Sequence, residues 1–311
     1  MNDKDKKSLI ERVCRGIAAN RVPGLHFPGY FLGLHARGMD KSEVWTALPY
    51  GAHCANANGD MNIAAIALLA DMGPGAAMRV HLPEATRMAT ATLQLQFTGI
   101  PVRSDLECHA RFDGFFEGAA AVQGRTSGRL VADGKVVCHT VGTFATPPAP
   151  PGVKVVPVPW EAMERLPPPV APRDMAPDEK QILKSARAAL KAVDEKRSFI
   201  EHLWAQIAKP RAGEEGGADN TVRIGPHIGN RVGHVQGGVM IGIAAASAVA
   251  ALPANARLTG ASAWYISAGM GKRLRVRSRL LQRGRTIAVV RTEVIGDNNR
   301  RMLELVTSHA F

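Results

Sequence analysis

Residues 56–78 read NANGDMNIAAIALLADMGPGAAM, and residues 230–252 read NRVGHVQGGVMIGIAAASAVAAL. Each stretch opens with a loop containing Asn and Gly and continues into a long apolar run. From Met61 to Met72 the apolar residues recur at i, i+3, i+4, i+7, i+8 and i+11, which is helical spacing. The second run is apolar nearly all round. A helix with so little polar surface must be enclosed, so both stretches are predicted to be central, buried helices.

Runs of strand character follow both stretches. They span 90–97, 104–115, 117–131 and 135–145 in the first half, and 257–266, 273–282, 285–296 and 301–310 in the second. Polar and apolar residues alternate within 90–97, and Asp133-Gly134 is a typical hairpin turn. One apolar helix followed by a four-strand meander predicts an antiparallel sheet wrapped around that helix. Because this order occurs twice, the predicted fold class is α+β, with two similar domains in tandem.

The connection between the two halves is rich in proline. Residues 146–177 hold eleven of the twenty prolines, which favours an extended connector over helix or internal strand. Residues 178–208 then show helical spacing of apolar residues. We therefore predict an N-terminal domain with a leading helix over 1–146, a linker over 147–177, a connecting helix and loop over 178–219, and a C-terminal domain over 220–311.

The composition is that of a folded protein with a sizeable core. Hydrophobic residues make up 46% of the chain and charged residues 21%. The four cysteines form neither a CxxC pair nor a zinc-type cluster with histidine, which predicts reduced thiols and no metal site. The charged N-terminus does not resemble a signal peptide, and the run 235–252 reads as a buried helix. A cytoplasmic location without membrane contact is expected.

The net charge of +12 is concentrated in the last third, where residues 220–311 hold 13 basic and 3 acidic side chains. Arg275, Arg277 and Arg279 alternate with apolar residues, so they share one face of a predicted strand. That face is either a solvated or oligomer-facing surface or a site for phosphate groups. Aromatic residues make up only 5% of the chain and do not interleave with the arginines, so nucleic-acid binding is not expected.

The two loop-and-helix stretches resemble hotdog-fold thioesterases of the phenylacetic-acid-degradation type, whose motif is N-x-x-G-x-x-H-G-G with a carboxylate fifteen residues after the Asn. The first stretch has Asn56, Gly59 and then Asp71 in this register. The second has Asn230, Gly233 and Gly237-Gly238. The resemblance covers about 30–146 and 220–311. It implies that two hotdog domains pair and that each site takes residues from both.

Each half departs from the motif in its own way. The first has Asn62 in place of the His, and the second has Gln236 there and Ala245 in place of the acid. The resemblance therefore implies one competent site per chain, with Asp71 facing the loop 230–238. The mirror site, formed by Asn56 and Asn62 against Ala245, would lack a carboxylate.

The resemblance implies an acyl-CoA thioesterase that needs no cofactor beyond the coenzyme A of its substrate. Asp71 would be a general base or a nucleophile, and the N–H groups of Gly237 and Gly238 would hold the carbonyl oxygen. Asn230 would orient water, assisted by Thr90. Candidate substrate contacts are Gln236, His234, Asn56 and Asn62.

Each candidate residue also has a structural explanation. Asp71 could cap a helix end near Gly73, the glycines could permit close packing, Asn230 could shape a turn, and Thr90 is ordinary strand material. A non-catalytic acyl-CoA-binding or regulatory protein is the alternative function, and a hotdog dehydratase or hydratase is less favoured. By analogy with paired hotdog domains, a homodimer of tandem chains is expected.

Overall fold

The computed structural model describes residues 3–40, 42–118, 122–148 and 167–311. The strands of the first half are β1 (His35–Met39), β2 (Glu43–Leu48), β3 (Ala89–Phe97), β4 (Leu106–Phe115), β5 (Gln123–Ala132) and β6 (Lys135–Ala145). Those of the second half are β7 (Lys209–Pro210), β8 (Gly217–Arg223), β9 (Arg257–Tyr265), β10 (Arg273–Arg283), β11 (Ile287–Ile295) and β12 (Arg301–Ala310). In the described residues they form one antiparallel sheet, in the order β1-β2-β4-β5-β6-β3-β9-β12-β11-β10-β8-β7.

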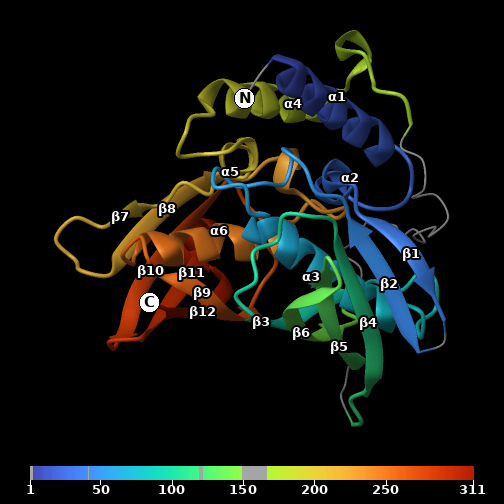
Figure 1. Cartoon of the computed structure of the whole chain (residues 1–311). Coiled ribbons are helices and arrows are strands. Elements are labelled where there is room, and N and C mark those ends of the chain that lie inside the picture. The colour runs from blue at the N-terminus through green and yellow to red at the C-terminus, as the bar shows by residue number, and fades with distance from the viewer. Residues whose placement is uncertain (1–2, 41, 119–121, 149–166) are drawn as a thin grey trace.

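Each half of this sheet curves around one apolar helix (Figure 1). Helix α3 (Ile63–Arg79) packs on β2, β4, β5 and β6, and α6 (Gly237–Ala250) packs on β8, β10, β11 and β12. The predicted α+β class, with two sheet-wrapped helices in tandem, is confirmed. Within the described residues, no helix has both the length and the apolar character needed to cross a bilayer.

The prediction of a simple four-strand meander is wrong in its strand order. β3 pairs with β6 and not with β4, which pairs instead with β2. β2 and β8 precede the helices and were not predicted. The other edge of β3 pairs with β9, and this contact joins the two halves into one sheet. Gln94 lies opposite Ser262 in that pairing, and Thr92–Trp264 and Gln96–Gly260 flank it symmetrically. A pseudo-twofold axis therefore passes between Gln94 and Ser262.

Each half is preceded by a long helix and a short one. These are α1 (Asp3–Asn20) and α2 (Phe27–Leu32) in the first half, and α4 (Pro177–Ala192) and α5 (Phe199–Leu203) in the second. The helices α1 and α4 lie side by side above the sheet-wrapped helices (Figure 1). Single-turn 3₁₀ helices span Pro172–Asp174, Pro226–Ile228 and Asp297–Asn299.

The single helix predicted over 178–208 is divided in two. Val193 is extended, and the Asp194 carboxylate accepts hydrogen bonds from the N–H groups of Lys196 and Arg197, which holds the chain in a turn. The second domain's first long strand, β8, begins at Gly217, three residues before the boundary predicted at 220. Most of the predicted proline-rich linker, residues 149–166, lies outside the described residues.

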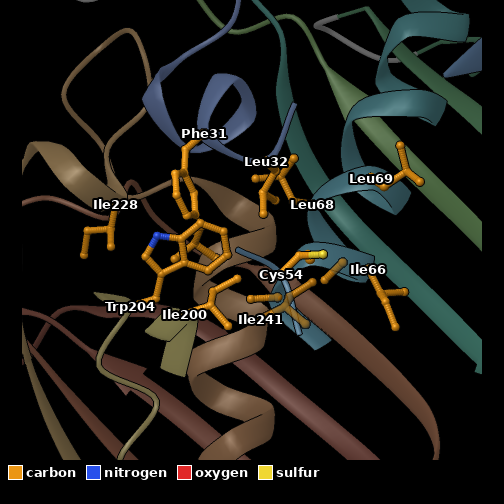
Figure 2. Close-up of a cluster of buried hydrophobic side chains, with 14 of the residues drawn as sticks. Phe31, Leu32, Cys54, Ile66, Leu68, Leu69, Ile200, Trp204, Ile228 and Ile241 are labelled. Atoms are coloured by element: carbon orange, nitrogen blue, oxygen red, sulfur yellow. The ribbon is translucent and has the colours of Figure 1, made fainter. Parts of the chain in front are cut away.

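A core cluster at the centre of the molecule draws on both halves (Figure 2). Trp204, which follows α5, is fully buried and meets the Phe31 ring of α2 edge to face, with 6.3 Å between ring centroids. Leu68 of α3 and Ile241 of α6 are buried in the same cluster. The leading helices are therefore part of one continuous core with the two sheet-wrapped helices.

The two central helices touch along their backbones, because small residues lie where they cross. A Cβ atom added to Gly238 would overlap the backbone of Leu68 and lie 2.7 Å from the carbonyl carbon of Ala67. A Cβ atom on Gly242 would likewise overlap Ala64. Residues larger than glycine at these two positions would push α3 and α6 apart.

We therefore expect Gly238→Ala to lower the free energy of unfolding by about 1–3 kcal/mol, the usual cost of overpacking. The neighbouring atoms belong to backbone, which cannot rotate away. Gly229→Ala is the matched control, because its Cβ would have no neighbour closer than 3.6 Å. Chemical denaturation measures both variants, and equal midpoints would contradict the backbone contact.

Candidate functional site

The site is built around the carboxyl group of Asp71, which is 6% exposed on α3. Thr90 Oγ1 of β3 donates a hydrogen bond to Asp71 Oδ1 at 2.6 Å. Gln236 Nε2, from the second half, donates one to Oδ2 at 3.0 Å. Two further residues that the sequence singled out thus bind the carboxyl group of Asp71, and one of them comes from the other half of the chain.

Local structure fixes both partners of Asp71. Gln236 caps α6, because its Oε1 accepts the N–H of Val239 at 2.8 Å, which leaves its NH₂ group for Asp71. On the other side, the β3–β6 register shifts between Thr90 and Thr92, so Ala91 forms a bulge. A bulge re-aims the side chain next to it, and here Thr90 is turned toward α3.

Burial raises the pKa of Asp71 to about 6, and the hydrogen bonds from Thr90 and Gln236 act in the opposite direction. The two hydrogen bonds favour the charged carboxylate, but removal from water disfavours it more. A carboxyl group with this pKa is largely ionised at neutral pH and still basic enough to take a proton from water. That is the behaviour of a general base.

Asp71 lies at one wall of a pocket of about 850 Å³. Its lining includes the predicted residues Thr90, Asn230, His234, Gln236 and Gly237. Gly238 is not among the lining residues, and its missing side chain serves the helix crossing instead. The Asn230 Oδ1 atom accepts the N–H groups of Val232 and His234, at 3.1 and 3.0 Å. The structure thus gives Asn230 a part in shaping its loop.

Different side chains occupy the mirror site. Asn62 caps α3 through the N–H of Ala64, and its amide group bonds to Asn56 Oδ1 at 2.7 Å and Gln206 Oε1 at 2.8 Å. Asn62 and Gln206 are buried, so this space is occupied by the chain's own amides. Asn56 and Asn62, predicted as substrate contacts, lie in this amide cluster and do not line the pocket of Asp71.

The pseudo-twofold axis identifies what stands opposite each site residue. Counting from Gln94 and Ser262, the position equivalent to Thr90 is Leu258, and the position equivalent to Phe97 is Tyr265. Ala245 occupies the position of Asp71. The mirror site therefore has apolar side chains at three positions where the Asp71 site has a carboxyl or hydroxyl group.

Sequence reasoning missed several residues of the pocket. Tyr265 lines it, and among the described lining residues the charged side chains are Arg21, Arg79, Arg87, Arg231 and the acid Asp71. The arginines of β10, singled out from the sequence, instead lie on its exposed face and do not line the pocket. The strand pairing that brings Tyr265 to Asp71 joins residues more than 150 positions apart. In the described residues, no three His, Cys, Asp or Glu side chains gather as a metal site would require.

Comparison with known proteins shows the fold. No protein-family model and no curated protein matches the chain. Among solved structures, a protein of Lactobacillus plantarum proposed to be an oleoyl thioesterase has a TM-score of 0.55 and 10% identity, over 90% of this chain and 98% of that one. A Thermobifida fusca protein proposed to be a thioesterase II has a TM-score of 0.54 and 13% identity, over 93% and 98%.

A hot dog fold protein of unknown function from Alicyclobacillus acidocaldarius has a TM-score of 0.51 and 11% identity, over 88% of this chain and 94% of that one. The chain therefore has the tandem hotdog fold predicted from its sequence. The closer resemblance to the phenylacetic-acid-degradation type stays a prediction.

The raised pKa of Asp71 has a consequence for stability. Below about pH 4 its carboxyl is protonated in both the folded and the unfolded chain. Between about pH 4 and 6 only the folded chain keeps the proton, so stability falls as pH rises through this range. A shift of this size amounts to on the order of 3 kcal/mol. We expect the difference in unfolding free energy between Asp71→Asn and the wild type to move in favour of the variant over this range.

Denaturant titrations at pH 4 and pH 7 measure this difference. Other titrating groups are common to both proteins and cancel. Asn at position 71 also places an amide opposite Gln236 Nε2, but that cost does not depend on pH. A constant difference would contradict a raised pKa at Asp71.

Proposed function

We propose that the chain hydrolyses acyl-CoA thioesters at a single composite site. The observation that carries this proposal is the Asp71 carboxyl group, held between Thr90 and Gln236 beside the N-terminus of α6. Hydrolysis of a thioester needs a base for water and a donor for the carbonyl oxygen. A buried carboxylate next to the first turn of a helix offers both.

In the proposed reaction Asp71 is the general base. Water attacks the thioester carbonyl carbon while Asp71 takes one of its protons, and a tetrahedral oxyanion forms. The carbonyl reforms as the carbon–sulfur bond breaks, and the proton held by Asp71 passes to the leaving thiolate. The products are one free acid and one thiol. The hydrogen bonds from Thr90 and Gln236 hold the carboxyl group in place, and burial raises its pKa to about 6, so we favour the base over an anhydride intermediate.

The surroundings of the pocket support a phosphate-bearing carrier. Four arginines line the pocket, and although Arg21 pairs with Glu179, the other three leave the described part of the lining basic. A volume of about 850 Å³ accommodates a large ligand. Arg87 is partly exposed and anchored at 2.5 Å on the carbonyl oxygen of Pro148. Coenzyme A carries phosphates and a long thiol arm, which fit a lining that combines arginines with apolar side chains such as Met72 and Met240.

Two of the solved structures compared above come from proteins proposed to be thioesterases. At 10–13% identity this similarity establishes the scaffold, and it supports the activity only as a precedent on that scaffold. A homodimer of tandem chains and a cytoplasmic location stay predictions.

We expect Asp71→Asn to abolish release of free thiol from acyl-CoA while leaving acyl-CoA binding intact. Without an ionisable carboxyl, the site has no base at this position. Asp113→Asn is the matched control, since Asp113 pairs with Arg111 on β4 and does not line the pocket. A colorimetric thiol assay over short, long and aromatic acyl-CoAs measures turnover, and calorimetry measures binding.

Equal rates for Asp71→Asn and the wild type would overturn the assignment of the base. Tight acyl-CoA binding by the wild type, with no thiol released from any substrate, would instead favour the non-catalytic binding protein.

The arginines that line the pocket give a separate prediction. We expect Arg87→Ala to raise KM for acyl-CoA about tenfold, since a lost charge-assisted contact costs about 1.5–3 kcal/mol. KM for the same acyl group on N-acetylcysteamine, which has no phosphate, should not change. Arg129→Ala, on the exposed side of β5, is the control. An equal rise for both carriers would show that Arg87 does not contact the phosphates.

A further inference from the structure

Tyr265 ends strand β9 and presents its ring to the pocket of Asp71. Its hydroxyl oxygen is buried and has no hydrogen-bond partner among the described residues. A buried hydroxyl group without a partner costs free energy, about 1–3 kcal/mol by mutational measures. Such a group at the wall of a pocket suggests that its partner arrives with a ligand.

Gly237 lies beside both polar groups of the site. A Cβ atom on Gly237 would be 3.0 Å from Tyr265 Oη and also 3.0 Å from Asp71 Oδ2. A side chain here would therefore be crowded by both groups, and glycine lets the hydroxyl group and the carboxylate approach the start of α6 closely. Both oxygens thus border the same short stretch of backbone at the wall of the pocket.

The backbone at this point supplies a second donor. Gly237 is the first residue of α6, and the N–H groups of a helix's first turn have no acceptor within the helix. Gln236 Oε1 takes the N–H of Val239. Gly237 and Tyr265 both line the pocket of Asp71.

The mirror site provides an internal comparison. Phe97 stands at the position equivalent to Tyr265, so the same ring is present there without the hydroxyl. A phenyl ring is thus sufficient for packing at this position, and the hydroxyl group of Tyr265 is not needed for it. Of the two equivalent sites, the one that has the carboxyl group of Asp71 also has the hydroxyl group.

We propose that Tyr265 is a catalytic residue whose hydroxyl, together with the N–H of Gly237, donates hydrogen bonds to the thioester carbonyl oxygen as that oxygen becomes negative. The inference rests on the proposed thioester hydrolysis and adds the oxyanion donor to it. No proton is transferred from Tyr265: it donates a stronger hydrogen bond in the tetrahedral intermediate and a weaker one when the carbonyl reforms.

The protonation state of Tyr265 suits this role. Burial first, and then the neighbouring charge of Asp71, raise the pKa of Tyr265 well above its ordinary value. The hydroxyl group therefore keeps its proton at neutral pH, where Asp71 is ionised. Base and donor are thus available together from about pH 6 upward.

The test is Tyr265→Phe, which reproduces the ring found naturally at Phe97. Loss of one oxyanion donor typically lowers kcat by a factor of about 100–1000, and we expect that loss with KM for acyl-CoA unchanged. Tyr50→Phe is the matched control, since the Tyr50 hydroxyl donates to the Gly59 carbonyl and does not line the pocket. Circular dichroism and thermal unfolding establish that both variants are folded.

The pH profile separates a donor from a residue that only adjusts Asp71. We expect the midpoint of the kcat profile to stay where the wild type has it. A shifted midpoint with full recovery of kcat at high pH would overturn the donor role, as would an unchanged kcat or a rise in KM alone. A wild-type protein that releases no thiol overturns the proposed function itself, whereas an active wild type with an equally active Tyr265→Phe overturns only this inference.

Discussion

The close crossing of α3 and α6 is the constraint on which the rest of the structure depends. Gly238 and Gly242 let the two backbones touch at Leu68 and Ala64, so that the N-terminus of one helix lies against the middle of the other. Asp71 stands one helical turn beyond Leu68. The same contact that buries two apolar helices therefore brings the start of α6 to the carboxyl group of Asp71, to which the cap residue Gln236 donates a hydrogen bond at 3.0 Å. The fold and the geometry of the site therefore both depend on the close crossing of α3 and α6.

A pseudo-twofold fold offers two equivalent sites, and the chain has kept the polar groups of one. A buried carboxyl carries a desolvation cost wherever it is placed. The structure has Asp71, Thr90 and Tyr265 on one side of the axis, and Ala245, Leu258 and Phe97 on the other. The space at the mirror site is filled by the hydrogen-bonded amides of Asn62, Asn56 and Gln206. Fusion of the halves in one chain permits this asymmetry, which two identical subunits could not have.

The sequence predicted the features that depend on local order. Helical spacing located α3, and the register from Asn56 and Asn230 located Asp71 and Gln236. It could not predict features that depend on long-range pairing. Tyr265 reaches Asp71 only because β9 pairs with β3, and no local pattern marks that contact. The apolar spacing over 178–208 corresponds to helical structure on both sides of Asp194. The spacing alone does not indicate that the Asp194 carboxylate accepts the following N–H groups, in a turn that separates the two helices. Gly238 was read as an oxyanion donor because its position in the motif does not distinguish donation from packing.

The candidate site gathers the groups that folding alone would avoid. Asp71 is a buried carboxyl with a raised pKa, Tyr265 has a buried hydroxyl without a partner among the described residues, and α6 begins with backbone N–H groups at the pocket wall. Each of these costs stability, and each would be satisfied by a thioester carbonyl and a water molecule. The apolar replacements across the axis show that the fold tolerates their removal. Packing alone does not require this set of unfavourable groups on one side only, whereas the proposed chemistry at the site would.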